Sequence, residues 1–99
     1  SQKKALKWFT EAGSVNNPVA LYYLAELAFS EKDYIKAYDY YLNSAQQSND
    51  NAQLKLAMLF AKGVGIEKNN QKAKEWLHRA AELGNKKAKG MLKHMKNSG

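Results

Sequence analysis

The sequence predicts an all-α fold, with about six antiparallel helices stacked as a right-handed superhelical α-solenoid. Two observations favour this fold. Apolar residues recur at helical spacing along most of the 99 residues, and Asn or Asp precedes most of the segments that they define. Placing Ala20 on Ala52 and on Ala88 then repeats the pattern at spacings of 32 and 36 residues, which bracket the ~34-residue period of two-helix repeats. The leucines that coincide in this register are Leu24, Leu56 and Leu92.

The first two expected helices cover residues 2–12 and 18–29. The apolar positions of the first are Ala5, Trp8, Phe9 and Ala12. These positions match the second helix of a repeat, so we expect this repeat to be truncated. Asn17 is the expected N-cap of the next helix, and Pro18 follows in the first turn, where its absent N–H costs nothing.

Four further helices are expected between residues 34 and 96. Their expected N-caps are Asp33, Asp50 or Asn51, Asn69 or Asn70, and Asn85. Their expected ends lie near Gln47, Gly63, Gly84 and Lys96. Gly63 and Gly65 supply the positive φ that turns after a helix commonly require. An aromatic residue that recurs in the second helix of each unit is expected to face the core, at Trp8, Tyr40 and Trp76.

The most specific pattern runs from Asn51 to Asn85, as two amphipathic helices joined by a Gly-Val-Gly-Ile loop. Its key positions are Ala52, Leu56, Ala57, Phe60, Gly63, Gly65, Lys72, Ala73, Trp76, Ala80, Ala81 and Gly84. This set resembles the Sel-one-like repeat, a longer-looped relative of the tetratricopeptide repeat. The resemblance implies one helical-repeat domain over 1–99. Its expected parts are the second helix of a truncated repeat at 1–17, repeats at 18–49 and 50–85, and a capping helix at 86–99.

Composition sets limits on what the protein can be. The chain has no cysteine, which excludes disulfides and thiolate metal sites. No apolar run approaches the ~20 residues that a membrane span needs, so we expect a soluble protein, with its compartment left open. Residues 66–99 carry nine Lys and Arg against three Glu, while residues 1–65 carry seven Lys against six acidic residues. The basic C-terminal part is either a solvated end, which is the plainer interpretation, or a surface for nucleic acid or anionic lipid.

Lysines on the last helix indicate where the array ends. Lys89, Lys93 and Lys96 occupy the flank by which an earlier helix would contact the next repeat. Burying unpaired charge costs several kcal/mol, so these residues predict a solvated face and a C-terminal cap. At the other end, Trp8 and Phe9 have lost one neighbouring helix. We therefore expect exposed apolar surface there, and self-association through it.

No arrangement of residues predicts catalysis. Neither His78 nor His94 has a second histidine at helical metal-site spacing, and no serine lies in a nucleophile-elbow context. The acidic residues are scattered, without a pair suited to acid–base work. The Gly63–Gly65 loop is read as a turn between helices, because no strand precedes it. We expect neither an enzyme nor a bound cofactor or metal.

The resemblance implies a protein–protein interaction scaffold or adaptor, with the partner bound in the concave groove formed by the first helix of each repeat. The residues expected to line this groove are Val19, Tyr22, Tyr23, Glu26, Asn51, Leu54, Lys55, Met58, Lys87, Met91 and His94. An alternative is a helical repeat that binds nucleic acid or an anionic surface through the basic C-terminal end. This alternative is less favoured, because the expected face mixes apolar residues with few lysines. A third possibility is a structural module inside a larger chain.

Overall fold

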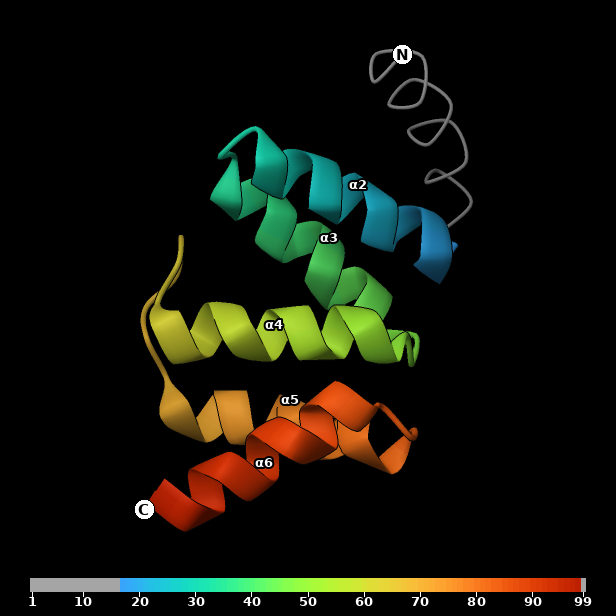
Figure 1. The fold of residues 1–99 in the computed structure, drawn as a ribbon. Coiled ribbons are helices and arrows are strands. Elements are labelled where there is room, and N and C mark those ends of the chain that lie inside the picture. The colour runs from blue at the N-terminus through green and yellow to red at the C-terminus, as the bar shows by residue number, and fades with distance from the viewer. Residues whose placement is uncertain (1–16, 99) are drawn as a thin grey trace.

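The computed structural model describes residues 17–98, with only the backbone described for residues 96–98. Five α-helices of 13 residues each make up this part of the chain. They are α2 (Pro18–Ser30), α3 (Tyr34–Gln46), α4 (Asp50–Lys62), α5 (Asn70–Glu82) and α6 (Lys86–Ser98). Each helix packs against the next, so the stack runs from α2 to α6 as an antiparallel zigzag (Figure 1). The predicted all-α solenoid is confirmed, and the helix expected over 2–12 lies outside the described residues.

An asparagine or aspartate side chain caps the start of every described helix. The caps accept hydrogen bonds from backbone N–H groups two or three residues ahead, which the first turn of a helix leaves unpaired. They are Asn17, Asp33, Asn49, Asn69 and Asn85. Asn17, Asp33, Asn69 and Asn85 agree with the expected caps.

The expected cap of α4 was wrong. Asn49 caps this helix, with its Oδ1 accepting from the N–H of Ala52 at 2.9 Å, whereas Asp50 is the first helical residue. Both can begin a helix, and Asp50 in the first turn still interacts favourably with the helix dipole. Sequence alone does not separate adjacent residues of the same capping type, because each could supply the acceptor oxygen.

The loop between α4 and α5 packs against the preceding unit. Gly63 and Gly65 have φ of 69° and 72°, as their expected role in the turn requires. A Cβ at Gly65 would collide with the Cβ of Tyr34 in α3, so this glycine is needed for space as well as for backbone conformation. The shorter turn after α2 has no glycine and uses Lys32, with φ 64°, in its place.

The core consists of two clusters that share helices α4 and α5. One joins α2, α3, α4 and α5, and the other joins α4, α5 and α6. Their most deeply buried members include many alanines, namely Ala25, Ala37, Ala45, Ala52, Ala57, Ala73, Ala80 and Ala88. A side chain this small lets the backbones of neighbouring helices approach closely. Trp76 packs on the edge of both clusters and so links one repeat to the next.

The recurrent aromatic position is less buried than its repetition predicts. Tyr40 and Trp76 are half-buried, while the residues that follow them, Tyr41 and Leu77, are only 1% exposed. One residue along a helix turns the side chain by 100°, so Tyr40 and Trp76 lie at the edge of the buried face and not at its centre. The buried stripe of α5 is Ala73, Leu77 and Ala80.

Helix α6 has one buried face. Ala88 is fully buried, and Leu92 and Met95 are half-buried against the second cluster. Lys89 and Lys93 are exposed, and the side chain of Lys96 lies outside the described part. That α6 is the end of the array stays a prediction.

Candidate binding groove

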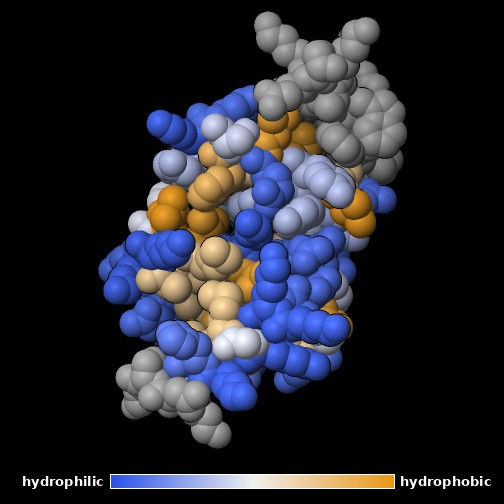
Figure 2. Space-filling model, viewed as in Figure 1, coloured by the Kyte–Doolittle hydropathy of each residue, from blue (hydrophilic) through white to orange (hydrophobic). Residues whose placement is uncertain are grey.

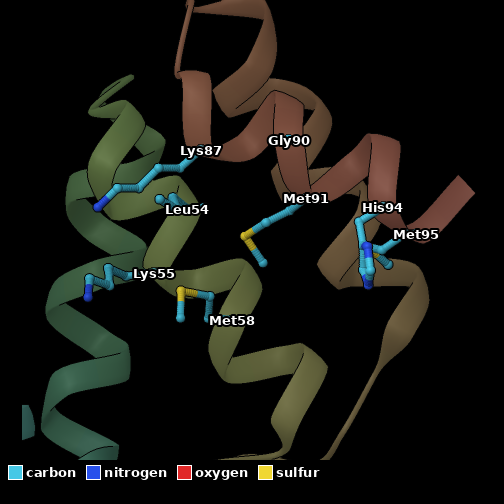
Figure 3. Close-up of a pocket in the computed structure, with 8 residues that line it drawn as sticks. All are labelled: Leu54, Lys55, Met58, Lys87, Gly90, Met91, His94 and Met95. Atoms are coloured by element: carbon cyan, nitrogen blue, oxygen red, sulfur yellow. The ribbon is translucent and has the colours of Figure 1, made fainter. Parts of the chain in front are cut away.

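Two adjoining hollows run across the first helices of the units. The larger, about 520 Å³, lies between α4 and α6 and is lined by Leu54, Lys55, Met58, Lys87, Gly90, Met91, His94 and Met95 (Figure 3). The smaller, about 200 Å³, lies between α2, α3 and α4 and is lined by Glu26, Phe29, Tyr41, Lys55, Met58, Leu59, Lys62 and Val64. Lys55 and Met58 line both, so we treat the hollows as one surface, which we call the groove. Figure 2 shows apolar surface over the α4–α6 half of the molecule, bordered by hydrophilic side chains.

Seven of the eleven residues expected on the concave face line the groove. They are Glu26, Leu54, Lys55, Met58, Lys87, Met91 and His94. Leu54 is buried, at 5% exposed, and packs with Ala57 and Leu77 in the second core cluster. It therefore forms part of the floor of the groove and not of an exposed row.

The other four expected residues lie outside both hollows. Val19 and Tyr23 are exposed, at 53% and 51%, and Asn51 is exposed near the Asn85 side chain, with its Oδ1 3.4 Å from Asn85 Nδ2. Tyr22 is half-buried against the first core cluster, with its ring centroid 6.1 Å from that of Tyr41. The helical spacing of α2 places Tyr22 opposite the core stripe, yet part of its side chain packs against the first core cluster. Its ring lies beside that of Tyr41 on α3.

Helical periodicity alone missed several lining residues. Tyr41 comes from α3, which was expected to contribute only to the core, and Val64 comes from a loop that has no periodicity. Met95 is half-buried against the second core cluster and also lines the groove. Phe29 and Tyr34 form an edge-to-face pair with centroids 5.2 Å apart, which holds Phe29 at the end of α2.

A carboxylate links the three helices of the smaller hollow. Glu26 on α2 accepts a hydrogen bond of 2.8 Å from the hydroxyl of Tyr41 on α3, and its Oε1 lies 3.9 Å from Lys55 Nζ on α4. Burial and the charge of Glu26 raise the pKa of Tyr22 to about 12. Burial and the hydrogen bond to Glu26 also raise the pKa of Tyr41 above its ordinary value. Both phenols therefore stay protonated near neutral pH, and the Tyr41 hydroxyl donates to Glu26.

The groove is positively charged. Lys55, Lys62 and Lys87 line it, and Glu26 is the one acidic residue among the lining positions of the two hollows. Lys55 lies beside Glu26, but Lys62 and Lys87 form no ion pair with any other described residue. The two cations therefore remain available to a partner.

Within residues 17–98, no group of three or more His, Cys, Asp or Glu side chains is placed to hold a metal ion. His78 is exposed on α5. In this same part of the chain, no helix combines the length and the apolar character needed to cross a membrane.

The repeat pattern of the sequence matches a known family. The family model described as Sel1 repeat matches residues 1–17, 18–49 and 50–85. The chain belongs to the Sel1 repeat family. A comparison with curated protein sequences finds no match.

Solved Sel1 repeat structures share this arrangement of helices. A Sel1 repeat protein from Oxalobacter formigenes is 33% identical, with a TM-score of 0.82, over 89% of this chain and 38% of that chain. The protective antigen c5321 of uropathogenic Escherichia coli, which displays an SLR fold, is 26% identical, with a TM-score of 0.89, over 95% and 21% of the two chains. The chain thus spans less than two fifths of the length of either protein. Helicobacter pylori cysteine rich protein B, 22% identical with a TM-score of 0.83 over 92% and 71% of the two chains, matches in fold.

Proposed function

We propose that this Sel1 repeat chain is a protein-interaction module, without catalytic activity, that binds a peptide segment of a partner protein in the groove. The observation that carries the proposal is the continuity of the groove. Lys55 and Met58 on the central helix line both hollows, so one extended or helical segment could contact α2, α4 and α6 together. Family membership adds support, because Sel1 repeats typically serve as scaffolds for other proteins.

The lining of the groove suits peptide binding. Met58 and Met91 are half-buried, and methionine is common on recognition surfaces because its flexible, polarisable side chain adapts to different partners. Leu54 and the second core cluster fix the floor beneath them. Covering this apolar surface would contribute ~25 cal/mol per Å² removed from water, and the lysines would add polar contacts.

A display selection tests the proposal without knowledge of the natural partner. The immobilised chain would be used to select binders from a random peptide library. The selected peptides would then be measured against Met58→Ser combined with Met91→Ser, and against Ile35→Ser as a control. Ile35 is 72% exposed and lies outside both hollows, so this control makes the same chemical change on another surface. Circular dichroism would check that each variant is folded.

We expect the selected peptides to bind the wild-type chain and Ile35→Ser with equal affinity, and the double variant at least about tenfold more weakly. Amide chemical-shift changes on peptide addition should concentrate in residues 54–62 and 87–95. Equal binding to the folded double variant would place the site elsewhere and reject the groove. Recovery of no peptide, together with tight binding of oligonucleotide or anionic vesicles, would favour the basic C-terminal end instead.

Two further expectations stay as predictions. Self-association through the helix over 2–12 concerns residues outside the described part. The repeats over 18–49 and 50–85 could also serve as a module within a longer protein, because the related structures are longer than this chain.

A further inference from the structure

We infer that the segment bound in the groove is acidic, with a large apolar side chain flanked by Asp or Glu. This inference rests on the proposed function and specifies the chemistry of its partner. It draws on the position of the apolar floor, on the lysines at its edge, and on the positive charge of residues 66–99.

The centre of the larger hollow is apolar. Figure 3 shows the side chain of Met91 extending from α6 into the space beside α4, where Leu54 and Met58 lie. The sequence has three methionines, and all three line this hollow, the third being Met95. A hollow of about 520 Å³ has room for a large apolar side chain. This part of the groove therefore selects an apolar anchor.

Two lysines border the apolar centre. Figure 3 shows Lys55 and Lys87 extending toward the same side of the hollow, one from each helix. Lys62 continues the positive edge along α4 into the smaller hollow. Glu26 lies near Lys55 at 3.9 Å, but it also accepts the Tyr41 hydroxyl, so it leaves the charges of Lys62 and Lys87 unbalanced.

The cost of desolvation decides the charge of the partner. A peptide over the methionines must partly exclude water from the neighbouring lysines, which costs free energy unless each ammonium gains a new partner. Carboxylates restore that interaction, while a neutral segment does so weakly and a basic one opposes it. The surrounding field acts in the same direction, because residues 66–99 carry nine basic and three acidic side chains.

The same lining favours an acidic peptide over a nucleic acid. Phosphate binders use tracks of cations, and single strands also need exposed aromatic rings for base stacking. In the larger hollow the cations are separated by methionines, and no aromatic ring other than His94 lines it. Arg79, the one arginine of the sequence, lies over the ring of Trp76 at 4.6 Å, outside both hollows.

Three focused libraries test this chemistry. Each would present the same randomised apolar centre, flanked on both sides by Glu, by Gln or by Lys. The selected peptides would be resynthesised with each of the three kinds of flanking residue. Their affinities would be measured by fluorescence anisotropy at low and high salt. The protein variants would be Lys87→Glu, which reverses a groove charge, and Lys89→Glu as its matched control. Lys89 is exposed on the same helix but does not line the groove, so both variants change the net charge equally.

We expect Glu-flanked peptides to bind about tenfold more tightly than their Gln copies, and high salt to reduce this difference. Lys87→Glu should weaken the Glu-flanked peptides and strengthen the Lys-flanked copies, while Lys89→Glu should leave both nearly unchanged. Weaker binding of the peptides to the double variant Met58→Ser with Met91→Ser would show that they occupy the groove.

The outcomes separate the two proposals. If peptides bind in the groove but the three flanks give equal affinities, the inference of an acidic partner fails and the proposed function stands. If no library yields a peptide sensitive to the methionine substitutions, the proposed function fails. If Lys87→Glu and Lys89→Glu weaken binding equally, or a labelled oligonucleotide binds more tightly than every peptide, the general positive field and not the groove selects the partner, and the inference is overturned.

Discussion

The side chain of Asn85 donates a hydrogen bond of 2.8 Å from its Nδ2 to Oδ2 of Asp50, which joins the first turns of α6 and α4. The Oδ1 of the same asparagine accepts from the N–H of Ala88 at 2.9 Å and so caps α6. Asn85 is 9% exposed. One buried amide therefore begins the last helix and also fixes its position against the helix that forms the opposite wall of the groove.

We predict that Asn85→Ala lowers the free energy of unfolding by roughly 1–3 kcal/mol, because it removes a helix cap and leaves a buried N–H and Asp50 without their partner. Asn70→Ala is the matched control. Asn70 is exposed, and its neighbour Asn69 supplies the cap of α5, so this change should stay within about 0.5 kcal/mol. Urea denaturation of both variants provides the measurement, and equal losses would contradict the assigned role of Asn85.

We predict that Gly65→Ala destabilises the fold by more than Gly84→Ala. Both glycines have positive φ, 72° and 94°, so either alanine incurs a backbone cost of ~1–2 kcal/mol. Only at Gly65 would the new Cβ meet the Cβ of Tyr34, while nothing lies within 4 Å of the equivalent atom at Gly84. Thermal denaturation should show the difference. Equal midpoints would mean that the loop does not depend on contact with α3.

We predict that Leu77→Ala costs roughly 2–5 kcal/mol, as expected for emptying a buried leucine site, whereas Leu83→Ala has little effect. Leu77 is 1% exposed and Leu83 is 52% exposed at the end of the same helix. Chemical denaturation would be followed by circular dichroism. A loss for Leu77→Ala no larger than for Leu83→Ala would show that the face assigned to the core of α5 is wrong.

We predict an alkaline loss of stability that depends on Tyr22. Its pKa is about 12 in the folded chain and near 10 when unperturbed, because burial and then the charge of Glu26 disfavour the phenolate. A group whose pKa is raised by folding stabilises the fold fully below the unfolded pKa, and this contribution is lost as pH rises through the folded pKa. Stability should therefore fall between pH 10 and about 12. Phenylalanine has no ionisable hydroxyl, so the Tyr22→Phe variant should lack this part of the fall in stability. The free energy of unfolding would be measured against pH for both proteins, and identical curves would contradict the role of Tyr22.

We predict that oxidation weakens peptide binding in the groove. All three methionines line its larger hollow, and sulfoxide formation makes each apolar thioether polar. Placing a polar group against an apolar anchor costs ~1–3 kcal/mol, so affinity for a selected peptide should fall about tenfold after mild peroxide treatment. The control replaces Met58, Met91 and Met95 by leucine, a change of similar volume. Equal losses in both proteins would assign the effect to another residue.

The helices and turns could be predicted from the sequence because local interactions specify them. Each cap bonds to an N–H two or three residues ahead, apolar side chains recur every turn, and Gly63 adopts a conformation that most other residues disfavour. The repeat spacing then implied the solenoid. These relations span few residues, so they can be read without knowing where the rest of the chain lies.

The rotation of each helix about its axis was decided by tertiary packing. On α5, Leu77 is buried and Trp76 only half-buried, although both lie near the inward face by periodicity. The same packing sends Tyr22 toward Tyr41 and leaves Met95 at the edge of the groove. Side-chain period alone fixes a face only to within about one residue, or 100°.

The sequence by itself thus predicted an all-helical repeat protein and seven of the residues that line the groove. Tertiary structure decided which of those side chains meet. Leu54 became part of the floor, Lys55 came within 3.9 Å of Glu26, and Asp50 became the partner of Asn85 instead of a cap. The reason is physical. The Lys55–Glu26 and Asp50–Asn85 contacts join residues 29 and 35 positions apart. Their geometry depends on how closely whole helices pack, which no local pattern encodes.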